Sequence, residues 1–151
     1  MYDLFVKFLS VFFPLLLCLS SPALAKNVEQ DEKSCLTAIE GVEIISSEQL
    51  IALVQKEERF VILDVRQESE WLAGHIDSSV NIPVAALTEK ALSELVEKNE
   101  PVIVYCDGIS CHRSMEAVKK IISLGWKNIF WLQGGLAEWG RQGYPQVKGL
   151  K

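Results

Sequence analysis

The stretch PVIVYCDGISCHRS, residues 101–114, joins an apolar run, a loop with two cysteines and the start of a helix. Residues 101–105 have the length and the apolar, β-branched content of a buried strand. From Ser114 to Gly125, apolar residues recur at helical spacing, and the final glycine is typical of a helix end. The loop therefore leaves the carboxyl end of a strand and leads into a helix N-terminus, the place where open α/β sheets bind ligands.

The flanking sequence repeats this succession of strands and helices. Ser46 and Gln49 have the spacing of a capping box, which predicts that a helix begins at residue 47. The apolar patterns predict strands at 42–46, 59–65, 79–83, 101–105 and 128–132, and helices at 47–58, 68–74, 87–99, 114–125 and 136–143. Alternation at this spacing predicts an α/β fold whose parallel sheet is covered by helices on both faces.

Composition and charge limit the classes of protein to be considered. The 151 residues, of which 49% are hydrophobic and 23% charged, are enough for one globular domain. The net charge is −5, and the lysines and arginines form no cluster in the sequence. These features argue against nucleic acid as a partner.

The first 25 residues have the pattern of a secretory signal peptide. Lys7 precedes an apolar run at 8–20, and small residues surround a cleavage point after Ala25. The run contains Pro14 and is shorter than the roughly 20 apolar residues of a membrane span. We expect the mature protein to be periplasmic or secreted, with no membrane contact after cleavage. The expected division of the chain is a signal peptide at 1–25, a flexible lead-in at 26–40 and a domain at 41–151.

Four cysteines are present, and Cys18 leaves with the signal peptide. The mature chain then carries Cys35, Cys106 and Cys111 in a compartment where disulfides persist. The number is odd, and Cys35 on the lead-in is open to three interpretations: a free thiol, which we favour, a link to a second chain, or a resolving cysteine that folds back over the loop. The spacing of Cys106, Cys111 and His112 matches no common zinc motif, so we expect neither a metal nor another cofactor.

Cys106 occupies the position in this loop where a thiol can be activated. The reactive form of cysteine is the thiolate, and its pKa falls at helix N-termini and beside cations. His112 and Arg113 bring positive charge into the loop, and Gly108 permits a tight turn in which backbone N–H groups face the sulfur. Asp107 would raise the pKa of Cys106 if its carboxylate faced the sulfur, so we expect it to point outward. A cysteine after a strand is often only a buried apolar residue, but the cationic loop favours a reactive thiol.

Two stretches outside the loop give the chain a resemblance to a known family. ILDVRQESEWLAGHIDSSVNIP at 62–83 resembles the first signature of the rhodanese superfamily, and WLQGGLAEWGRQGYP at 131–145 resembles its closing pattern. With the cysteine loop between them, the resemblance covers residues 42–147. It implies a rhodanese-like three-layer α/β/α fold with a central, mainly parallel sheet.

The resemblance also implies an activity and a set of site residues. By position, Cys106 corresponds to the nucleophile of a sulfurtransferase, which carries sulfane sulfur as a persulfide. The expected partners are a small sulfur donor and an acceptor, which is cyanide or a thiol, including a thiol on a protein. The loop expected to bind the anionic substrate comprises Asp107, Gly108, Ile109, Ser110, His112, Arg113 and Ser114.

One position departs from the family's pattern. An arginine is typical five residues after the nucleophile, where this chain has Cys111, and Arg113 lies two residues further on. Without that bidentate guanidinium, thiosulfate is a less favourable substrate and phosphatase activity is not expected. The pattern Y-C-x-G-x-x-C-x-x-S at 105–114 is similar to that of a branch of exported rhodanese-like proteins.

Three hypotheses for the loop remain open. In a sulfurtransferase, Cys111 either tunes the site or resolves the persulfide on Cys106 as a disulfide. In a thiol–disulfide oxidoreductase or redox sensor, the same two cysteines cycle, which requires their Cα atoms to lie within about 7 Å. In a non-catalytic binding module, Cys106 is inert and has an ordinary pKa.

Other notable side chains are interpreted as structural. His75 is expected to fix a turn by a hydrogen bond, and Asp64 and Arg66 are expected to pair with each other or with Glu70. Trp131 and Trp139 are expected to be core or rim aromatic residues first and pocket walls second.

Overall fold

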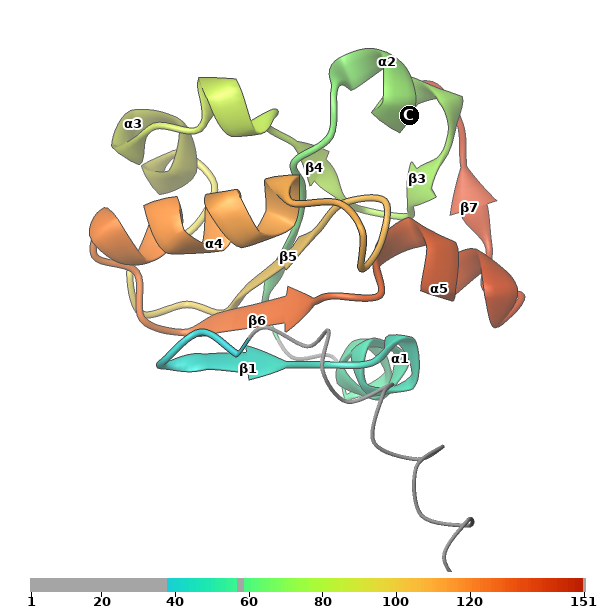
Figure 1. Ribbon diagram of the computed structural model, residues 1–151, viewed down its shortest axis with the longest axis horizontal. Helices are drawn as coiled ribbons and strands as arrows, with labels where there is room; N and C mark the ends of the chain where they lie inside the picture. Colours follow the sequence, from blue (N-terminus) through green and yellow to red (C-terminus); the bar gives the residue numbers. More distant parts are fainter. Residues whose placement is uncertain (1–37, 57–58, 151) are drawn as a thin grey trace, which may run out of the picture. The chain divides into compact units, whose positions relative to one another are not determined.

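The computed structural model describes residues 38–56 and 59–150. The predicted signal peptide, most of the lead-in and Cys35 lie outside the described residues. The strands are β1 (Val42–Ile44), β2 (Val61–Asp64), β3 (His75–Ile76), β4 (Val80–Asn81), β5 (Val102–Tyr105), β6 (Ile129–Leu132) and β7 (Gln146–Val147). The helices are α1 (Ser47–Gln55), α2 (Glu68–Ala73), α3 (Glu89–Ser93), α4 (Arg113–Ser123), α5 (Gly135–Arg141) and the short 3₁₀ helix η2 (Val84–Ala86) (Figure 1). Within the described ranges, none of these helices is both long and apolar enough to cross a membrane.

Five of the strands form one parallel sheet in the order β1-β6-β5-β2-β4. Every neighbouring pair is parallel, and β5 lies at the centre between β6 and β2. Tyr105 at the end of β5 is paired with Asp64 at the end of β2. The loops that follow these two strands therefore begin at the same edge of the sheet. The predicted α/β fold with a parallel sheet is confirmed.

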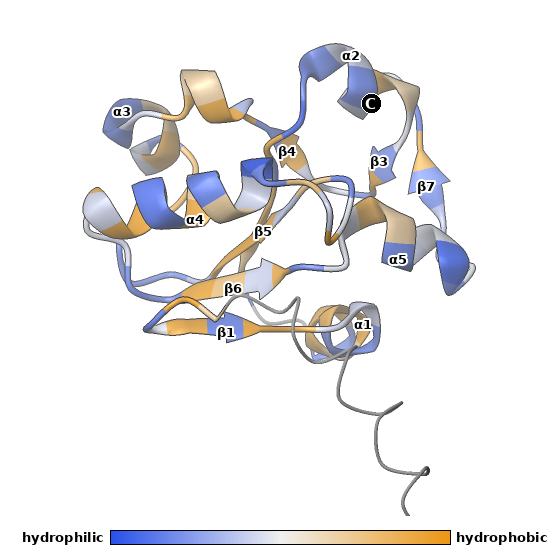
Figure 2. Cartoon of the chain, viewed as in Figure 1, coloured by the Kyte–Doolittle hydropathy of each residue, from blue (hydrophilic) through white to orange (hydrophobic). Residues whose placement is uncertain are grey.

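Alternating side chains of β5 enter two separate hydrophobic layers. Val102, Val104 and the adjoining Cys106 pack with residues of α3 and α4 on one face. Ile103 and Tyr105 pack with residues of α1 and α5 on the other face. In Figure 1, α3 and α4 lie on one side of the strands and α1 on the other, and Figure 2 shows the hydrophobic colouring of β5 between them. This two-residue period produces three layers and places Cys106 on the α4 side.

A capping box sets the start of α1, as the sequence predicts. The Gln49 N–H donates to Ser46 Oγ at 3.3 Å, and the Ser46 N–H donates to Gln49 Oε1 at 2.8 Å. These bonds satisfy two N–H groups that a helix start leaves free. The first helix therefore begins at the predicted residue, Ser47.

The main differences from the pattern-based prediction concern one helix and a second, small sheet. The helix predicted at 87–99 is much shorter, because α3 ends at Ser93. The Glu97 N–H is bound by the Glu100 carboxylate at 3.0 Å, so this part of the chain turns instead of continuing the helix. The small antiparallel sheet of β3 and β7 has no counterpart in the prediction, since two-residue strands carry no periodic pattern.

Candidate active site

The backbone of the cysteine loop is anchored to helix α5. Cys106 follows β5 directly, and its carbonyl accepts a hydrogen bond from the Leu136 N–H at 2.9 Å. The carbonyl of Asp107 accepts from the Ala137 N–H at 2.8 Å, so the loop satisfies two N–H groups of the first helical turn. Gly135 (φ +56°) permits this approach, because a Cβ there would lie 2.4 Å from the Cys106 carbonyl oxygen. The anchor fixes the position from which the Cys106 side chain extends.

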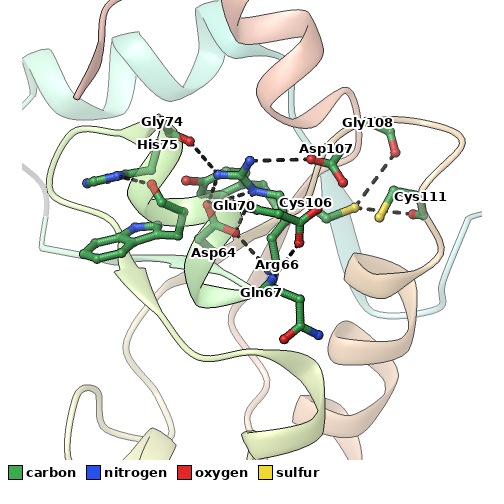
Figure 3. Close-up of polar contacts among 12 residues, drawn as sticks. Asp64, Arg66, Gln67, Glu70, Gly74, His75, Cys106, Asp107, Gly108 and Cys111 are labelled. Atoms are coloured by element: carbon green, nitrogen blue, oxygen red, sulfur yellow. Dashed lines mark hydrogen bonds and ion pairs between the residues drawn. The ribbon is translucent and has the colours of Figure 1, made fainter. Parts of the chain in front are cut away.

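The sulfur of Cys106 is buried and faces the first turn of α4. The residue is 0% exposed, and its Sγ lies 3.0 Å from Ser114 Oγ. The carbonyl oxygens of Cys111 and Gly108 lie 3.4 and 3.9 Å from the same sulfur (Figure 3). The Trp131 indole N–H donates to Ser114 Oγ at 3.0 Å. Because the indole uses only a lone pair of this hydroxyl, the Ser114 O–H can turn to the sulfur when Cys106 is ionised.

These surroundings favour the protonated form of Cys106. Burial raises the pKa of its thiol to about 11, and the hydrogen bond with the Cys111 side chain adds to the rise. The hydroxyl and backbone N–H of Ser114 offset part of this increase in pKa. The prediction that the loop lowers the pKa of Cys106 is wrong. Carbonyl oxygens of the loop reach the sulfur, and the guanidinium of Arg113 is bound by other groups.

The guanidinium of Arg113 binds two carboxylates and a thiol. Its Nη1 and Nη2 donate to the two carboxylate oxygens of Glu70 at 2.5 and 3.0 Å, and Nη2 also donates to Asp107. Its Nε donates to Cys111 Sγ at 3.3 Å. Burial alone would raise the pKa of Cys111, but the hydrogen bonds from Arg113 and Cys106 outweigh it and lower this pKa. The more acidic thiol of the loop is therefore Cys111.

A second ion pair, more deeply buried, lies at the end of β2. Arg66 binds the Asp64 carboxylate through Nε and Nη2, and the shortest of these distances is 2.6 Å. Its Nη1 lies 3.5 Å from Asp107, as Figure 3 shows. The Asp107 carboxylate also binds the guanidinium of Arg113, so it contacts both arginines. As expected, Asp107 points to these groups and not to the sulfur. The predicted Asp64–Arg66 pair is confirmed, whereas Glu70 pairs with Arg113.

The turn after α2 is held by His75. Its Nδ1 lies 2.7 Å from the Trp71 carbonyl oxygen, and its ring stacks on the Trp71 ring with centroids 4.0 Å apart. The structural interpretation of His75 is confirmed.

The tip of the cysteine loop is open to solvent. Ile109 is 52% exposed, and Ser110 and His112 are exposed as well. Gly108 is buried, and a Cβ at this position would lie 3.2 Å from the Gly134 carbonyl oxygen. The predicted substrate loop therefore divides into a buried part near the Cys106 thiol and an exposed tip.

Sequence reasoning missed two contacts of the site. Trp131 is a buried core residue, as predicted, but its indole also holds Ser114. The parallel register contains a signal for this contact, because Trp131 pairs with Val104, which shares a face with Cys106. The bond between Arg113 and Glu70 has no local signal, since the two residues are 43 positions apart.

Both loop cysteines are free thiols in this structure. Figure 3 shows their sulfur atoms close together, and a side-chain hydrogen bond between them affects the pKa of each. In the part of the chain that the structure describes, no three His, Cys, Asp or Glu side chains are grouped to hold a metal ion. The arrangement is suited to thiol chemistry, because Cys111, which is partly exposed and has a lowered pKa, lies beside Cys106, which is buried and has a raised pKa.

Comparisons with known proteins relate this geometry to a family. The family model of the rhodanese-like domain matches residues 46–142. The uncharacterized protein YibN of Escherichia coli is 31% identical over 110 residues, which cover 72% of this chain and 74% of YibN. The thiosulfate sulfurtransferase GlpE of Coxiella burnetii is 35% identical over 88 residues, which cover 58% of this chain and 77% of GlpE.

A solved structure agrees with these matches. The crystal structure of the Alr3790 protein from Anabaena superposes with a TM-score of 0.64 and 30% identity, covering 71% of this chain and 94% of that chain. Several curated relatives are longer proteins, and the match spans 38% of the length of one and 51% of another. From the family model and these relatives together, the chain belongs to the rhodanese-like domain family.

Proposed function

We propose that this protein is an exported sulfurtransferase that carries sulfane sulfur as a persulfide on Cys106. Membership of the rhodanese-like family and the similarity to a sulfurtransferase support the reaction class. The proposal rests above all on the environment of the Cys106 sulfur, which is buried after β5 and lies 3.0 Å from Ser114 Oγ. The signal-peptide pattern of residues 1–25 supports export.

A buried thiol beside a hydroxyl is suited to hold a reactive persulfide. The Cys106 thiolate attacks the sulfane sulfur of a donor, and the sulfur–sulfur bond of the donor breaks, with its electron pair leaving on the departing group. An acceptor thiolate or cyanide then attacks the outer sulfur and releases Cys106 as a thiolate. Burial keeps water from the intermediate, and the Ser114 hydroxyl, which is held by Trp131, donates to the charged sulfur.

The charges around the loop favour a donor other than thiosulfate. Arg66 is bound by Asp64, and Arg113 is bound by Glu70. Neither guanidinium is therefore free to receive an oxyanion, and the carboxylate of Asp107 adds negative charge beside both. A persulfide or polysulfide needs no bidentate cation, so we propose these as the donor class.

Mass measurement tests the proposed reaction. The reduced protein is incubated with a small alkyl persulfide or with thiosulfate, alkylated, digested and mapped by peptide mass. We expect one added sulfur that is retained on Cys106, with faster loading from the alkyl persulfide. A protein that gains sulfur on no cysteine from either donor contradicts the proposal. Export is tested separately by fractionating cells that express the full chain, where a mature protein beginning at Lys26 is expected.

A further inference from the structure

We propose that sulfur enters this site through Cys111, which takes the sulfur from the donor and passes it inward to Cys106. The proposal rests on the sulfurtransferase function proposed above, and it assigns the first chemical step to a second catalytic residue. The sequence pattern predicts only a tuning or resolving thiol at Cys111. The contacts of this side chain are those of an attacking nucleophile.

The two thiols differ in their access to solvent. Cys106 is 0% exposed, whereas Cys111 is partly exposed beside the open tip of the loop. The carbonyl groups of Cys111 and Gly108 lie 3.4 and 3.9 Å from Cys106 Sγ and cover part of it. A donor molecule that approaches from solvent therefore meets the sulfur of Cys111 before that of Cys106.

Arg113 holds Cys111 in the form that attacks. Its Nε lies 3.3 Å from Cys111 Sγ, and both of its terminal nitrogens are bound by Glu70. The two bonds to Glu70 fix the plane of the guanidinium, so that the Nε–H stays directed at the sulfur. A cation beside sulfur favours the thiolate, in agreement with the lowered pKa of Cys111.

The two steps balance without a further reactant. In the first step, the Cys111 thiolate attacks the outer sulfur of an alkyl persulfide, the donor's sulfur–sulfur bond breaks, and the alkyl thiolate leaves with the electron pair. In the second step, Cys106 attacks the outer sulfur now bound to Cys111, and Cys111 leaves as a thiolate. The outer sulfur keeps its own proton through both transfers, and the proton lost by the Cys106 thiol is taken up by the alkyl thiolate released in the first step.

The difference in acidity between the thiols sets the direction of the second step. In exchange at sulfur, the thiol of lower pKa is the better leaving group. The pKa of Cys111 is lowered, and burial raises that of Cys106. The two residues are in contact, because Cys106 Sγ lies 3.4 Å from the Cys111 carbonyl oxygen, and Figure 3 shows the two sulfur atoms next to each other. Sulfur therefore moves from the partly exposed thiol to the buried one.

A time course of sulfur loading tests the relay. The full chain with Cys18 and Cys35 replaced by serine retains Cys106 and Cys111 as its thiols. This protein is mixed with an alkyl persulfide, quenched by alkylation at successive times and mapped by peptide mass. We expect the added sulfur on Cys111 first and on Cys106 later.

Two variants in the same background separate the steps. In Cys106→Ser, the added sulfur is expected to remain on Cys111. In Cys111→Ser, the loading of Cys106 is expected to slow by about tenfold or more, because the donor must reach a buried thiol of high pKa. Circular dichroism spectra identical to those of the parent show that both variants remain folded.

The outcomes distinguish the relay from the function on which it rests. The relay is overturned if Cys106 gains sulfur in Cys111→Ser at the rate of the parent and Cys106→Ser gains no sulfur. The proposed persulfide on Cys106 is not contradicted by that result. It is also overturned if loading ends in a Cys106–Cys111 disulfide with release of hydrogen sulfide, which assigns Cys111 to resolution. Failure of the proposed function looks different, because then neither thiol of the parent protein gains sulfur.

Discussion

Two arginines lie near the same edge of the sheet, and each binds a carboxylate at nearly the same distance. After β2, the Arg66 side chain is 4% exposed and lies 2.6 Å from Asp64, whose side chain is 0% exposed. At the start of α4, the Arg113 side chain is 28% exposed and lies 2.5 Å from Glu70, whose side chain is 38% exposed. The two pairs therefore differ in burial and not in length.

Because of this difference in burial, we expect the Asp64–Arg66 pair to contribute to stability and the Glu70–Arg113 pair to contribute to the chemistry of the thiols. Loss of one partner from a buried pair leaves a charge that water cannot reach, so the pair is needed for stability. The partly exposed Glu70–Arg113 pair adds less to stability, but it holds the Arg113 guanidinium against the Cys111 sulfur. We therefore expect changes in the Asp64–Arg66 pair to affect unfolding, and changes in the Glu70–Arg113 pair to affect thiol reactivity.

The largest expected effect is that of Asp64→Asn. The substitution keeps the size of the side chain but removes the nearer counter-ion of the buried Arg66 and leaves only the longer, 3.5 Å contact with Asp107. We expect the free energy of unfolding to fall by about 3–5 kcal/mol, measured by urea denaturation. The matched control is Glu89→Gln, which removes a 2.7 Å ion pair with Lys98 between exposed side chains and is expected to cost about 1 kcal/mol or less. If Asp64→Asn and Glu89→Gln lower the free energy of unfolding equally, burial does not determine how much an ion pair contributes to stability.

A smaller effect is expected for Ser114→Ala. The substitution removes the hydroxyl between Cys106 and Trp131 and leaves the buried indole N–H without this partner. We expect a loss of about 1–3 kcal/mol in the free energy of unfolding. The pKa of Cys106 should also rise further, because the hydroxyl lowers it, and ultraviolet titration of the thiolate measures this change.

A control for this prediction is available in the same helix. Ser123 Oγ donates to the Lys120 carbonyl at 2.7 Å in an exposed position. Ser123→Ala is expected to change the free energy of unfolding by about 0.5 kcal/mol or less. A Ser114→Ala protein as stable as this control, with an unchanged pKa of Cys106, would show that the hydroxyl does not support the thiol.

Arg113→Gln is expected to change reactivity more than stability. Loss of the Nε–H and of the positive charge should raise the pKa of Cys111 and slow its alkylation several-fold at neutral pH. The rate of alkylation by iodoacetamide as a function of pH measures this, in a chain whose other cysteines are serine. Arg141→Gln, at an exposed arginine of α5, is the matched control and should leave the profile unchanged. If the pH profile of alkylation has the same midpoint in the parent, in Arg113→Gln and in Arg141→Gln, Arg113 is not the cause of the lowered pKa of Cys111.

Local patterns predict the sheet and the place of Cys106, but not the charges around it. Apolar, β-branched runs indicate the strands, and the position of Cys106 follows because a strand end and a helix start are adjacent in the sequence. The direction of Arg113 depends on Glu70, which is 43 positions away and belongs to helix α2. Spacing along the chain cannot show such a contact, and for this reason the sequence pattern predicts the lowered pKa at Cys106 instead of Cys111.

The smallest expected effect is the pH dependence of the exposed pair. The hydrogen bond from Arg113 lowers the pKa of Glu70 from its ordinary value of 4.5 to about 2. A carboxyl group whose pKa is lower in the folded state stabilises the fold above the unfolded value, and this contribution is lost as the pH falls from 4.5 towards 2. Because the Glu70 side chain is 38% exposed, we expect a contribution of about 1 kcal/mol or less. Glu70→Gln should therefore be slightly less stable than the parent in urea at neutral pH and equal to it near pH 2. A difference that persists unchanged in acid would mean that Glu70 supports the loop by packing and not by its charge.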